Sequence, residues 1–271
     1  MKVLVIGGGN MGFTYAEAMA KSTLLKEKDL MILDKSEERL SELKKHPLLA
    51  ACADLEACLP QADVVLIAVK PNHAPDLMAQ MKPLVNEQQV FVSIMAGVTM
   101  KVIQQGLGID KVVRAMPNLP AQVGLGMTSF TATDAVSRLE LATIEQLLDT
   151  TGRSIYLETE KEIDASTGIS GSGPAYIFYF MQSMLEAAIQ MGFPMDEARM
   201  LVHQTFAGAV KLFESADLDP TEWMARVASK GGTTRAALDW LEDNNVKELI
   251  KEAAYAAFNR AVELGKEFDH A

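Results

Sequence analysis

The order of apolar and polar residues divides the chain into two halves with different periodicities. In the first half, short continuous runs of Val, Ile and Leu alternate with amphipathic segments. Continuous apolar runs of this kind are typical of strands in a parallel sheet that helices cover on both faces. The pattern therefore predicts an α/β domain, with strands at residues 2–6, 30–33, 64–69, 90–94 and 111–115.

The second half has the pattern of helices alone. Residues 175–191 carry apolar side chains at helical spacing, and Glu186 is their only charge, which favours a helix that is buried almost all round. Further helices are expected at residues 196–215, 221–228, 233–244 and 246–267. With the boundary near residues 157–163, we predict an α/β domain over residues 1–160 and an all-helical domain over residues 161–271.

The first predicted strand runs directly into a glycine cluster, which consists of Gly7, Gly8, Gly9, Asn10, Met11 and Gly12. A helical pattern begins at once behind it, and this strand–turn–helix context makes the GxGxxG spacing informative. Gly7 permits a tight turn, Gly9 lets the backbone approach a pyrophosphate, and Gly12 allows close packing of helix on strand. A plain glycine turn is the alternative. The motif predicts a Rossmann-type domain that binds NADPH or NADH.

Asp34 stands at the end of the second predicted strand. In dinucleotide-binding folds, an acidic residue roughly 20 positions beyond the glycine motif binds the adenosine ribose, and Asp34 has about this spacing from Gly12. A carboxylate there binds the 2′-hydroxyl and repels a 2′-phosphate, so Asp34 favours NADH. Lys35 and Ser36 follow and could turn toward that phosphate, which leaves the preference open. Alternatively, Asp34 caps a helix that begins near Ser36.

Two other strand ends carry candidate ligand-binding residues, because ligands of open α/β sheets bind at the carboxyl ends of strands. They are Ala68, Val69, Lys70 and Pro71 after one strand, and Met95, Ala96 and Gly97 after the next. For Lys70, a solvated loop lysine is an equally good interpretation.

The most distinctive motif of the second half is a glycine pair followed by two threonines. Gly231 and Gly232 precede Thr233 and Thr234, which stand directly before a helical pattern. Free N–H groups at a helix start, with hydroxyls beside them, form a cradle for an anion. A simple helix cap needs one hydroxyl and no glycine pair, so it explains the motif less well. We expect a carboxylate site here.

The composition of the chain limits the kinds of partner that it can bind. The chain has 271 residues, 49% of them hydrophobic and 23% charged, with a net charge of −11. An acidic chain without basic clusters is a poor partner for nucleic acid or membrane surfaces, so an anionic ligand must be held by local geometry. No apolar stretch approaches the roughly 20 residues of a membrane helix, and no signal peptide is recognisable. These two features favour a cytoplasmic protein. The two cysteines and four scattered histidines indicate reduced thiols and no metal site.

The motifs GGGNMG, AVKP, SIMAGVT, RAMPNLPAQVGLG, SGSGPAY and ASKGGTTRAAL occur in the order and spacing of one family. Over essentially its whole length the chain resembles the pyrroline-5-carboxylate reductases. The resemblance implies reduction of the cyclic imine 1-pyrroline-5-carboxylate to L-proline by NADPH or NADH, the last step of proline biosynthesis. It also implies a helical domain that interlocks with its twin in a homodimer, and dimers that often assemble into larger rings.

The resemblance assigns roles to residues of both halves. It implies that the pyrophosphate lies over residues 7–12, the adenosine near residues 34–36, and the nicotinamide half near residues 68–71 and 95–98. It places the substrate carboxylate on the N–H groups of Gly231, Gly232 and Thr233 close to Ser229, and the hydroxyl of Thr234 on the ring nitrogen as the catalytic group. An imine nitrogen is basic enough to need no strong acid, so positioning supplies most of the catalysis.

The chain departs from the family pattern in the substrate loop, in the RAMPN segment and before the third apolar run. Lys230 takes the place of a proline, Leu119 that of a threonine, and residues 54–56 lack an asparagine that is common on the adenosine side. None of these changes touches Thr234 or the glycine pair.

Two other function classes compete with this interpretation. A reductase of another imine or of a β-hydroxy acid is one, and the latter would carry a catalytic lysine on a helix of the second half. Lys211 is the candidate, but a solvated helix residue is its simpler interpretation, and the glycine–threonine cradle has no place in that scheme. A dinucleotide-binding paralogue without catalysis is the other, against which the intact Thr234 argues. The apolar content of the second half exceeds what about 110 residues need alone, so we expect an obligate dimer.

Overall fold

The alternating strands and helices of the first half form one sheet in the computed structural model, which describes residues 1–26 and 29–269. The sheet has eight strands in the order β3-β2-β1-β4-β5-β6-β7-β8. All neighbouring strands are parallel except β6 and β7. The strands are β1 (Val3–Ile6), β2 (Leu30–Leu33), β3 (Ala50–Cys52), β4 (Val64–Ile67), β5 (Val90–Ser93), β6 (Val112–Met116), β7 (Gly126–Ala132) and β8 (Gly152–Tyr156).

The five strands expected from apolar runs are confirmed to within about two residues at each end, whereas β3, β7 and β8 were not expected. β3 has only three residues, two of them alanines. β7 buries Thr128, Ser129 and Thr131 among its apolar neighbours, so it lacks the continuous apolar run by which the other strands were found.

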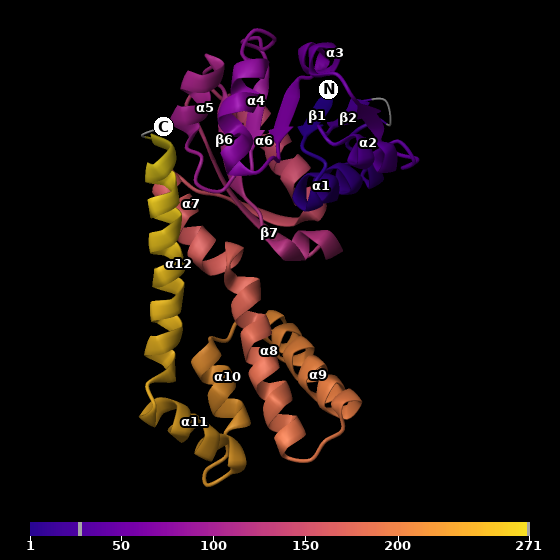
Figure 1. Cartoon of the computed structure of the whole chain (residues 1–271). Helices are drawn as coiled ribbons and strands as arrows, with labels where there is room; N and C mark the ends of the chain where they lie inside the picture. The colour runs from indigo at the N-terminus through magenta and orange to yellow at the C-terminus, as the bar shows by residue number, and fades with distance from the viewer. Residues whose placement is uncertain (27–28, 270–271) are drawn as a thin grey trace. The chain divides into compact units, whose positions relative to one another are not determined.

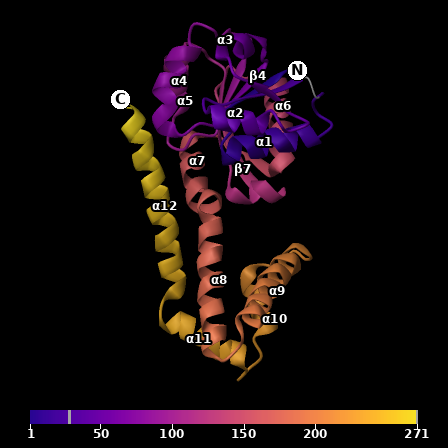
Figure 2. The same ribbon diagram turned by 45° about the vertical axis from the view of Figure 1, so that its right-hand side comes forward.

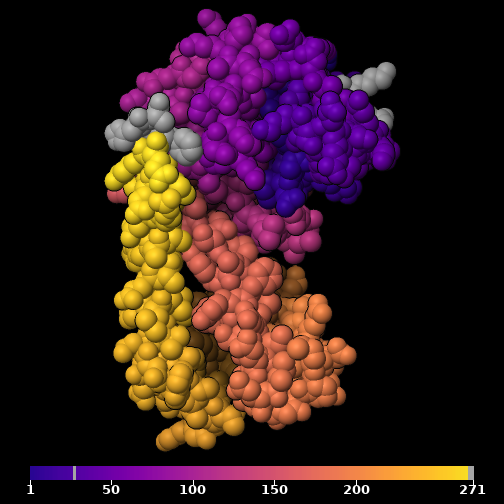
Figure 3. Space-filling view, viewed as in Figure 1, coloured from indigo at the N-terminus to yellow at the C-terminus, as the bar shows by residue number. Residues whose placement is uncertain are grey.

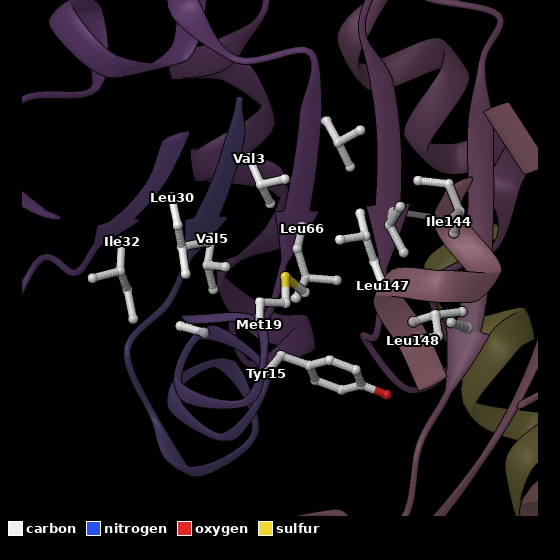
Figure 4. Packing of buried hydrophobic residues seen from close by; sticks show 14 of the residues in the cluster. Val3, Val5, Tyr15, Met19, Leu30, Ile32, Leu66, Ile144, Leu147 and Leu148 are labelled. Carbon is white, nitrogen blue, oxygen red and sulfur yellow. The ribbon is translucent and has the colours of Figure 1, made fainter. Parts of the chain in front are cut away.

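Helices cover both faces of the sheet (Figure 1). Successive strand residues point to opposite faces, so Val3 and Val5 of β1 join one buried cluster while Leu4 and Ile6 join the other. Figure 4 shows the first cluster, where Tyr15 and Met19 pack against the sheet. The helices here are α1 (Asn10–Lys21), α2 (Glu37–Leu43), α3 (Leu55–Cys58), α4 (Ala74–Met81), α5 (Met100–Leu107), α6 (Arg138–Leu148) and α7 (Glu160–Ser166).

The second half is helical, as the sequence predicts. It consists of a π-helix (Thr167–Gly171), α8 (Gly173–Gln190), α9 (Met195–Glu214), α10 (Pro220–Val227), α11 (Thr233–Asp243) and α12 (Val246–Asp269). α8 and α9 pack side by side (Figure 2). The chain divides into two compact units, of which the first holds Met1–Ser172 together with the end of the chain from Ala256, and the second holds Gly173–Tyr255.

One expectation about α8 is wrong for the isolated chain. The sequence favoured a helix buried almost all round, but no residue of α8 is buried, and Phe178 and Tyr179 are 60% and 71% exposed. Apolar side chains of the second unit therefore reach its surface. In the space-filling view of Figure 3, α8 and α9 carry the salmon and orange colours of residues 173–214. Exposed apolar faces of this kind are typical of surfaces that another molecule covers.

Among residues 1–26 and 29–269, no helix is long and apolar enough to cross a membrane. No cluster of three or more His, Cys, Asp and Glu side chains among them could hold a metal ion. Cys52 and Cys58 are both free thiols, and burial raises the pKa of the Cys58 thiol to about 12, with a further contribution from Cys52 beside it.

Candidate active site

The glycine turn between β1 and α1 is compressed against the sheet. Gly7 has a φ of +104°, and its N–H donates to the carbonyl of Leu33 at 2.7 Å. A Cβ on Gly12 would overlap the carbonyl oxygen of Gly7 and crowd the Ala68 side chain. Only glycine fits these two positions. Gly7 requires a left-handed backbone conformation, and the backbone of Gly12 lies directly against the backbone of Gly7.

Gly9 has the opposite environment, because a Cβ there would meet no atom within 4 Å. Gly9 is the N-cap residue of α1 and makes no side-chain capping bond, and both Gly9 and Asn10 are exposed. The first N–H groups of α1 are thus open to a ligand, and the helix dipole favours an anion at this end. The turn fits the pyrophosphate of a dinucleotide.

The sheet topology brings two of the predicted segments together. Strand order reverses between β1 and β4, and ligands of open α/β sheets bind in the crevice at such a switch point. Gly7 leaves β1 there beside Ala68, which leaves β4 and donates its N–H to the carbonyl of Ile6 at 2.8 Å. Residues 7–12 and 68–71 therefore face the same crevice, and Lys70 is exposed at its edge.

Asp34 at the end of β2 is tied to the glycine turn. Its Oδ2 accepts the N–H of Gly8 at 2.7 Å, and its Oδ1 accepts the N–H of Ser36 at 2.8 Å. The alternative that Asp34 caps the next helix is wrong, because Ser36 is the N-cap of α2 and its hydroxyl accepts the N–H of Arg39 at 3.3 Å. Lys35 between them is exposed.

Arg39 is a residue at this site that the sequence did not single out. Its Nε donates to the carbonyl of Gly8 at 2.6 Å, and its guanidinium lies 4.9 Å from the ring centre of Phe13. A second guanidinium nitrogen pairs with Glu42. The signal was present as a basic residue in the first turn after Asp34, but nothing in the sequence showed that it reaches back to the glycine turn.

The loop after β5 is mostly covered. Met95 and Gly97 are buried, and Ala96 between them is exposed. Gly97 has a φ of +76°, and a Cβ there would lie 3.0 Å from the Cβ of Leu264 in α12. Of the three residues predicted here, Ala96 alone has a side chain open to a ligand.

The predicted carboxylate cradle opens α11. Gly231 has a φ of +72°, and Gly232 is the N-cap residue, with its N–H on the carbonyl of Ser229 at 3.0 Å. Thr233 and Thr234 occupy the first two helical positions, and neither hydroxyl caps the helix. The alternative of a simple cap is therefore wrong, and the first N–H groups of α11 are free of any side-chain cap.

The lack of a side chain at Gly232 leaves room for the hydroxyl of Ser229. A Cβ on Gly232 would come within 2.5 Å of the Ser229 hydroxyl oxygen, so this hydroxyl lies directly over the glycine pair. Thr234 is half-buried, and Lys230 is exposed. Main-chain N–H groups and hydroxyls thus converge at the start of one helix, which is the donor set that a carboxylate requires.

Lys211, the candidate for a β-hydroxy-acid reductase, does not have the environment of a catalytic lysine. Its side chain is 84% exposed and pairs with Glu214 at 3.0 Å, one turn along α9. It is a solvated helix residue, as its simpler interpretation held.

The doubly wound sheet with its open glycine turn, followed by a separate helical unit, defines the class of Rossmann-type NAD(P)-dependent oxidoreductases. Residues 2–97 match the family described as NADP oxidoreductase coenzyme F420-dependent, and residues 160–264 match pyrroline-5-carboxylate reductase dimerisation. The chain belongs to the pyrroline-5-carboxylate reductase family, as the sequence motifs indicated.

Relatives in this family extend over the whole chain. The pyrroline-5-carboxylate reductase of Aquifex aeolicus is 32% identical over 265 residues, which is 97% of either chain, and that of Pseudomonas aeruginosa is 31% identical over 267 residues, 98% of this chain and 97% of the relative. A solved pyrroline-5-carboxylate reductase from Coxiella burnetii has a TM-score of 0.91 at 32% identity and covers 97% of this chain and 98% of its own. The Plasmodium falciparum enzyme, solved with NADP bound, has a TM-score of 0.87 at 26% identity and covers 98% of both chains.

Proposed function

We propose that this chain reduces 1-pyrroline-5-carboxylate to L-proline with NADPH or NADH. The observation that carries the proposal is the start of α11, where uncapped N–H groups, the Ser229 hydroxyl and Thr234 converge beside a glycine pair. A cyclic imine with a carboxylate needs an anion cradle and a hydroxyl near its nitrogen. Family membership over the full length points to the same reaction.

The roles of the two half-sites follow from their chemistry. In the proposal, residues 1–160 hold the dinucleotide and residues 161–271 hold the substrate and the dimer interface. The substrate carboxylate accepts the N–H groups of Gly231, Gly232 and Thr233. The Thr234 hydroxyl hydrogen-bonds the ring nitrogen, which gains a proton as the imine carbon is reduced.

The cofactor, when bound, supplies the hydride that the imine carbon receives. The glycine turn holds its pyrophosphate, residues 34–36 face its adenosine ribose, and residues 68–71 and 95–97 flank its nicotinamide half. The chain itself contributes orientation, an anion site and one hydroxyl. Orientation alone can account for a large part of a rate enhancement in a reaction of this kind.

We further propose that the chain works as a homodimer in the cytoplasm. The uncovered apolar side chains of α8 support the dimer, because a second copy can bury them. The free thiols of Cys52 and Cys58 support a reducing compartment. Cell fractionation tests the location, and recovery with the exported fraction would contradict it.

One assay tests the reaction. Purified protein is mixed with NADH or NADPH and pyrroline-5-carboxylate, the nicotinamide absorbance is followed, and the product is identified as proline by chromatography. Loss of absorbance with equimolar proline supports the proposal. The proposal fails if neither cofactor is oxidised although both bind in a separate titration.

A further inference from the structure

A buried arginine lies in the middle of the sheet. Arg114 on β6 is 1% exposed, and its two terminal nitrogens pair with Glu160 at 3.2 Å and with Asp164 at 2.6 Å, both on α7. Its Nε has no hydrogen-bond partner among the described residues. The charge of Arg114 is therefore balanced by these two carboxylates, which come from one helix.

The two carboxylates differ in one respect. Oε1 of Glu160 also accepts the N–H of Met100 at 2.8 Å, whereas the carboxylate of Asp164 binds Arg114 and does not reach the start of α5. Met100 is the first residue of α5, and its N–H is one of the donors that a helix start leaves unpaired. The first turn of α5 contains no acidic residue of its own, so Glu160 supplies the negative charge that the helix dipole favours there.

These contacts hold both ends of the loop that follows β5. At its start, Ser93 is the register partner of Arg114 across β5 and β6. At its end, Met100 is bound by Glu160, which Arg114 holds in turn. Residues 94–99 thus leave the sheet beside Arg114 and return to the same ion pair.

A cavity of about 240 Å³ joins this ion pair to the loop, because Ala96 and Gly97 line it together with Arg114 and Asp164. A shift of the loop that drew Glu160 away would leave the buried charge of Arg114 without one of its partners, which is costly. We propose that Glu160 is a positioning residue, which fixes the start of α5 and thereby holds residues 95–97 in the geometry that binds the nicotinamide half of the dinucleotide. This inference rests on the proposed dinucleotide site.

The first test compares Glu160→Ala with Asp164→Ala. Each removes one carboxylate from Arg114, but only the first releases the N–H of Met100. In hydrogen exchange without ligand, we expect residues 95–101 to exchange roughly fivefold faster in Glu160→Ala than in Asp164→Ala. Glu160→Gln keeps an acceptor oxygen and should restore the slow exchange.

Binding supplies the second measurement. The Kd for NADPH, titrated without any imine substrate, should rise several-fold in Glu160→Ala and stay near the wild-type value in Asp164→Ala and Glu160→Gln. Because no turnover is involved, this result does not depend on which substrate the enzyme reduces. Equal effects of the two alanine variants on exchange and on Kd would overturn the proposal and leave Glu160 a purely structural partner of Arg114.

A third variant keeps the test valid if Glu160→Ala does not fold. Met100→Pro removes the N–H that Glu160 accepts and leaves the Arg114 pair intact, and proline is well tolerated at the first position of a helix. Thr99 before it has φ −74° and ψ 156°, which suits a residue before proline. We expect Met100→Pro to bind NADPH several-fold more weakly than Met100→Ala, and identical Kd values would contradict the positioning role.

Discussion

The carboxylate of Asp34 accepts the backbone N–H of Gly8 at 2.7 Å, so the residue expected to recognise the ribose also fixes the glycine turn. Its other oxygen accepts the N–H of Ser36. A carboxylate has about four lone-pair positions, and these two bonds leave room for a ribose hydroxyl. In the proposed site, Asp34 therefore links the shape of the turn to the choice of cofactor.

Replacing Asp34 by Asn should shift the preference toward NADPH. The substitution removes the charge that repels a 2′-phosphate. At short range near a surface this repulsion is about 1 kcal/mol or more, so the ratio of the Kd values for NADH and NADPH should change roughly fivefold. Titration of both dinucleotides measures the ratio. Glu37→Gln, which removes an exposed carboxylate from the first turn of α2, is the control. An equal shift in both variants would show that the effect is not specific to Asp34.

The glycine turn allows stability and binding to be separated. Gly12→Ala places a Cβ against the Gly7 carbonyl and should cost about 2 kcal/mol of unfolding free energy. Gly9→Ala meets no atom and has a compatible φ of −66°, so its stability should change by less than about 0.5 kcal/mol. Because its methyl group occupies the approach of the pyrophosphate, Gly9→Ala should still weaken dinucleotide binding. Urea unfolding and dinucleotide titration check both effects, and a normal Kd for Gly9→Ala would remove Gly9 from the site.

Thr234 should matter for turnover and not for cofactor binding. Thr234→Ala removes the hydroxyl that we propose stabilises the ring nitrogen, and kcat should fall on the order of 100-fold. Thr234→Ser keeps a hydroxyl and should retain most of the activity. Steady-state kinetics and NADPH titration on the three proteins provide the comparison. Unchanged kcat in the alanine variant would exclude a role for Thr234 in the chemical step.

The parts of the fold that the sequence predicted are those with a strong local pattern. The apolar runs of β1, β2, β4, β5 and β6 and the spacing of α9 to α12 are local, because burial on both faces or on one stripe leaves a period in the sequence. β7 lacks such a run because Thr128 and Thr131 are buried in it. The hydroxyl of Thr128 is satisfied by Tyr15, 113 positions away, and no local pattern reveals such a partner.

The candidate site divides in the same way. The glycine turn and the start of α11 were predictable because each is one short segment with its own conformation. Arg39 and Arg114 were not singled out, because their roles depend on partners elsewhere in the chain, such as Gly8 and Glu160. The burial of α8 was wrongly predicted for a related reason. The apolar sequence indicates that α8 packs against other apolar side chains, but it does not indicate whether these belong to the same chain.

Acid should weaken one ion pair in the first unit. Partial burial alone would raise the pKa of Glu140, but hydrogen bonds from Lys111 at 2.7 Å and from Ser137 outweigh it and lower the pKa below the usual 4.5. A carboxyl group whose pKa is lower in the folded than in the unfolded state stabilises the fold at every pH above its unfolded-state pKa. This stabilisation is lost as pH falls through its folded-state pKa. Glu140→Gln should therefore cost about 1 kcal/mol at pH 7, and this cost should shrink as pH falls below 4.5 and through the lowered pKa of the folded state. Urea unfolding at several pH values tests this, with Glu145→Gln on the same helix as control, and a pH-independent difference would contradict it.

The uncovered apolar face of α8 predicts that the chain assembles with copies of itself. Phe178 is 60% exposed in the single chain, and a stable interface buries about 800 Å² on each partner with aromatic residues at its centre. Light scattering should give a dimer or a larger assembly at micromolar concentration. Phe178→Glu should shift the protein toward monomers, because a charge buried in an interface without a partner costs several kcal/mol. Lys211→Glu changes a side chain that is 84% exposed on α9 and should leave the assembly intact. A wild-type monomer with full activity, or a Phe178→Glu variant that assembles as the wild type does, would show that α8 is not the interface.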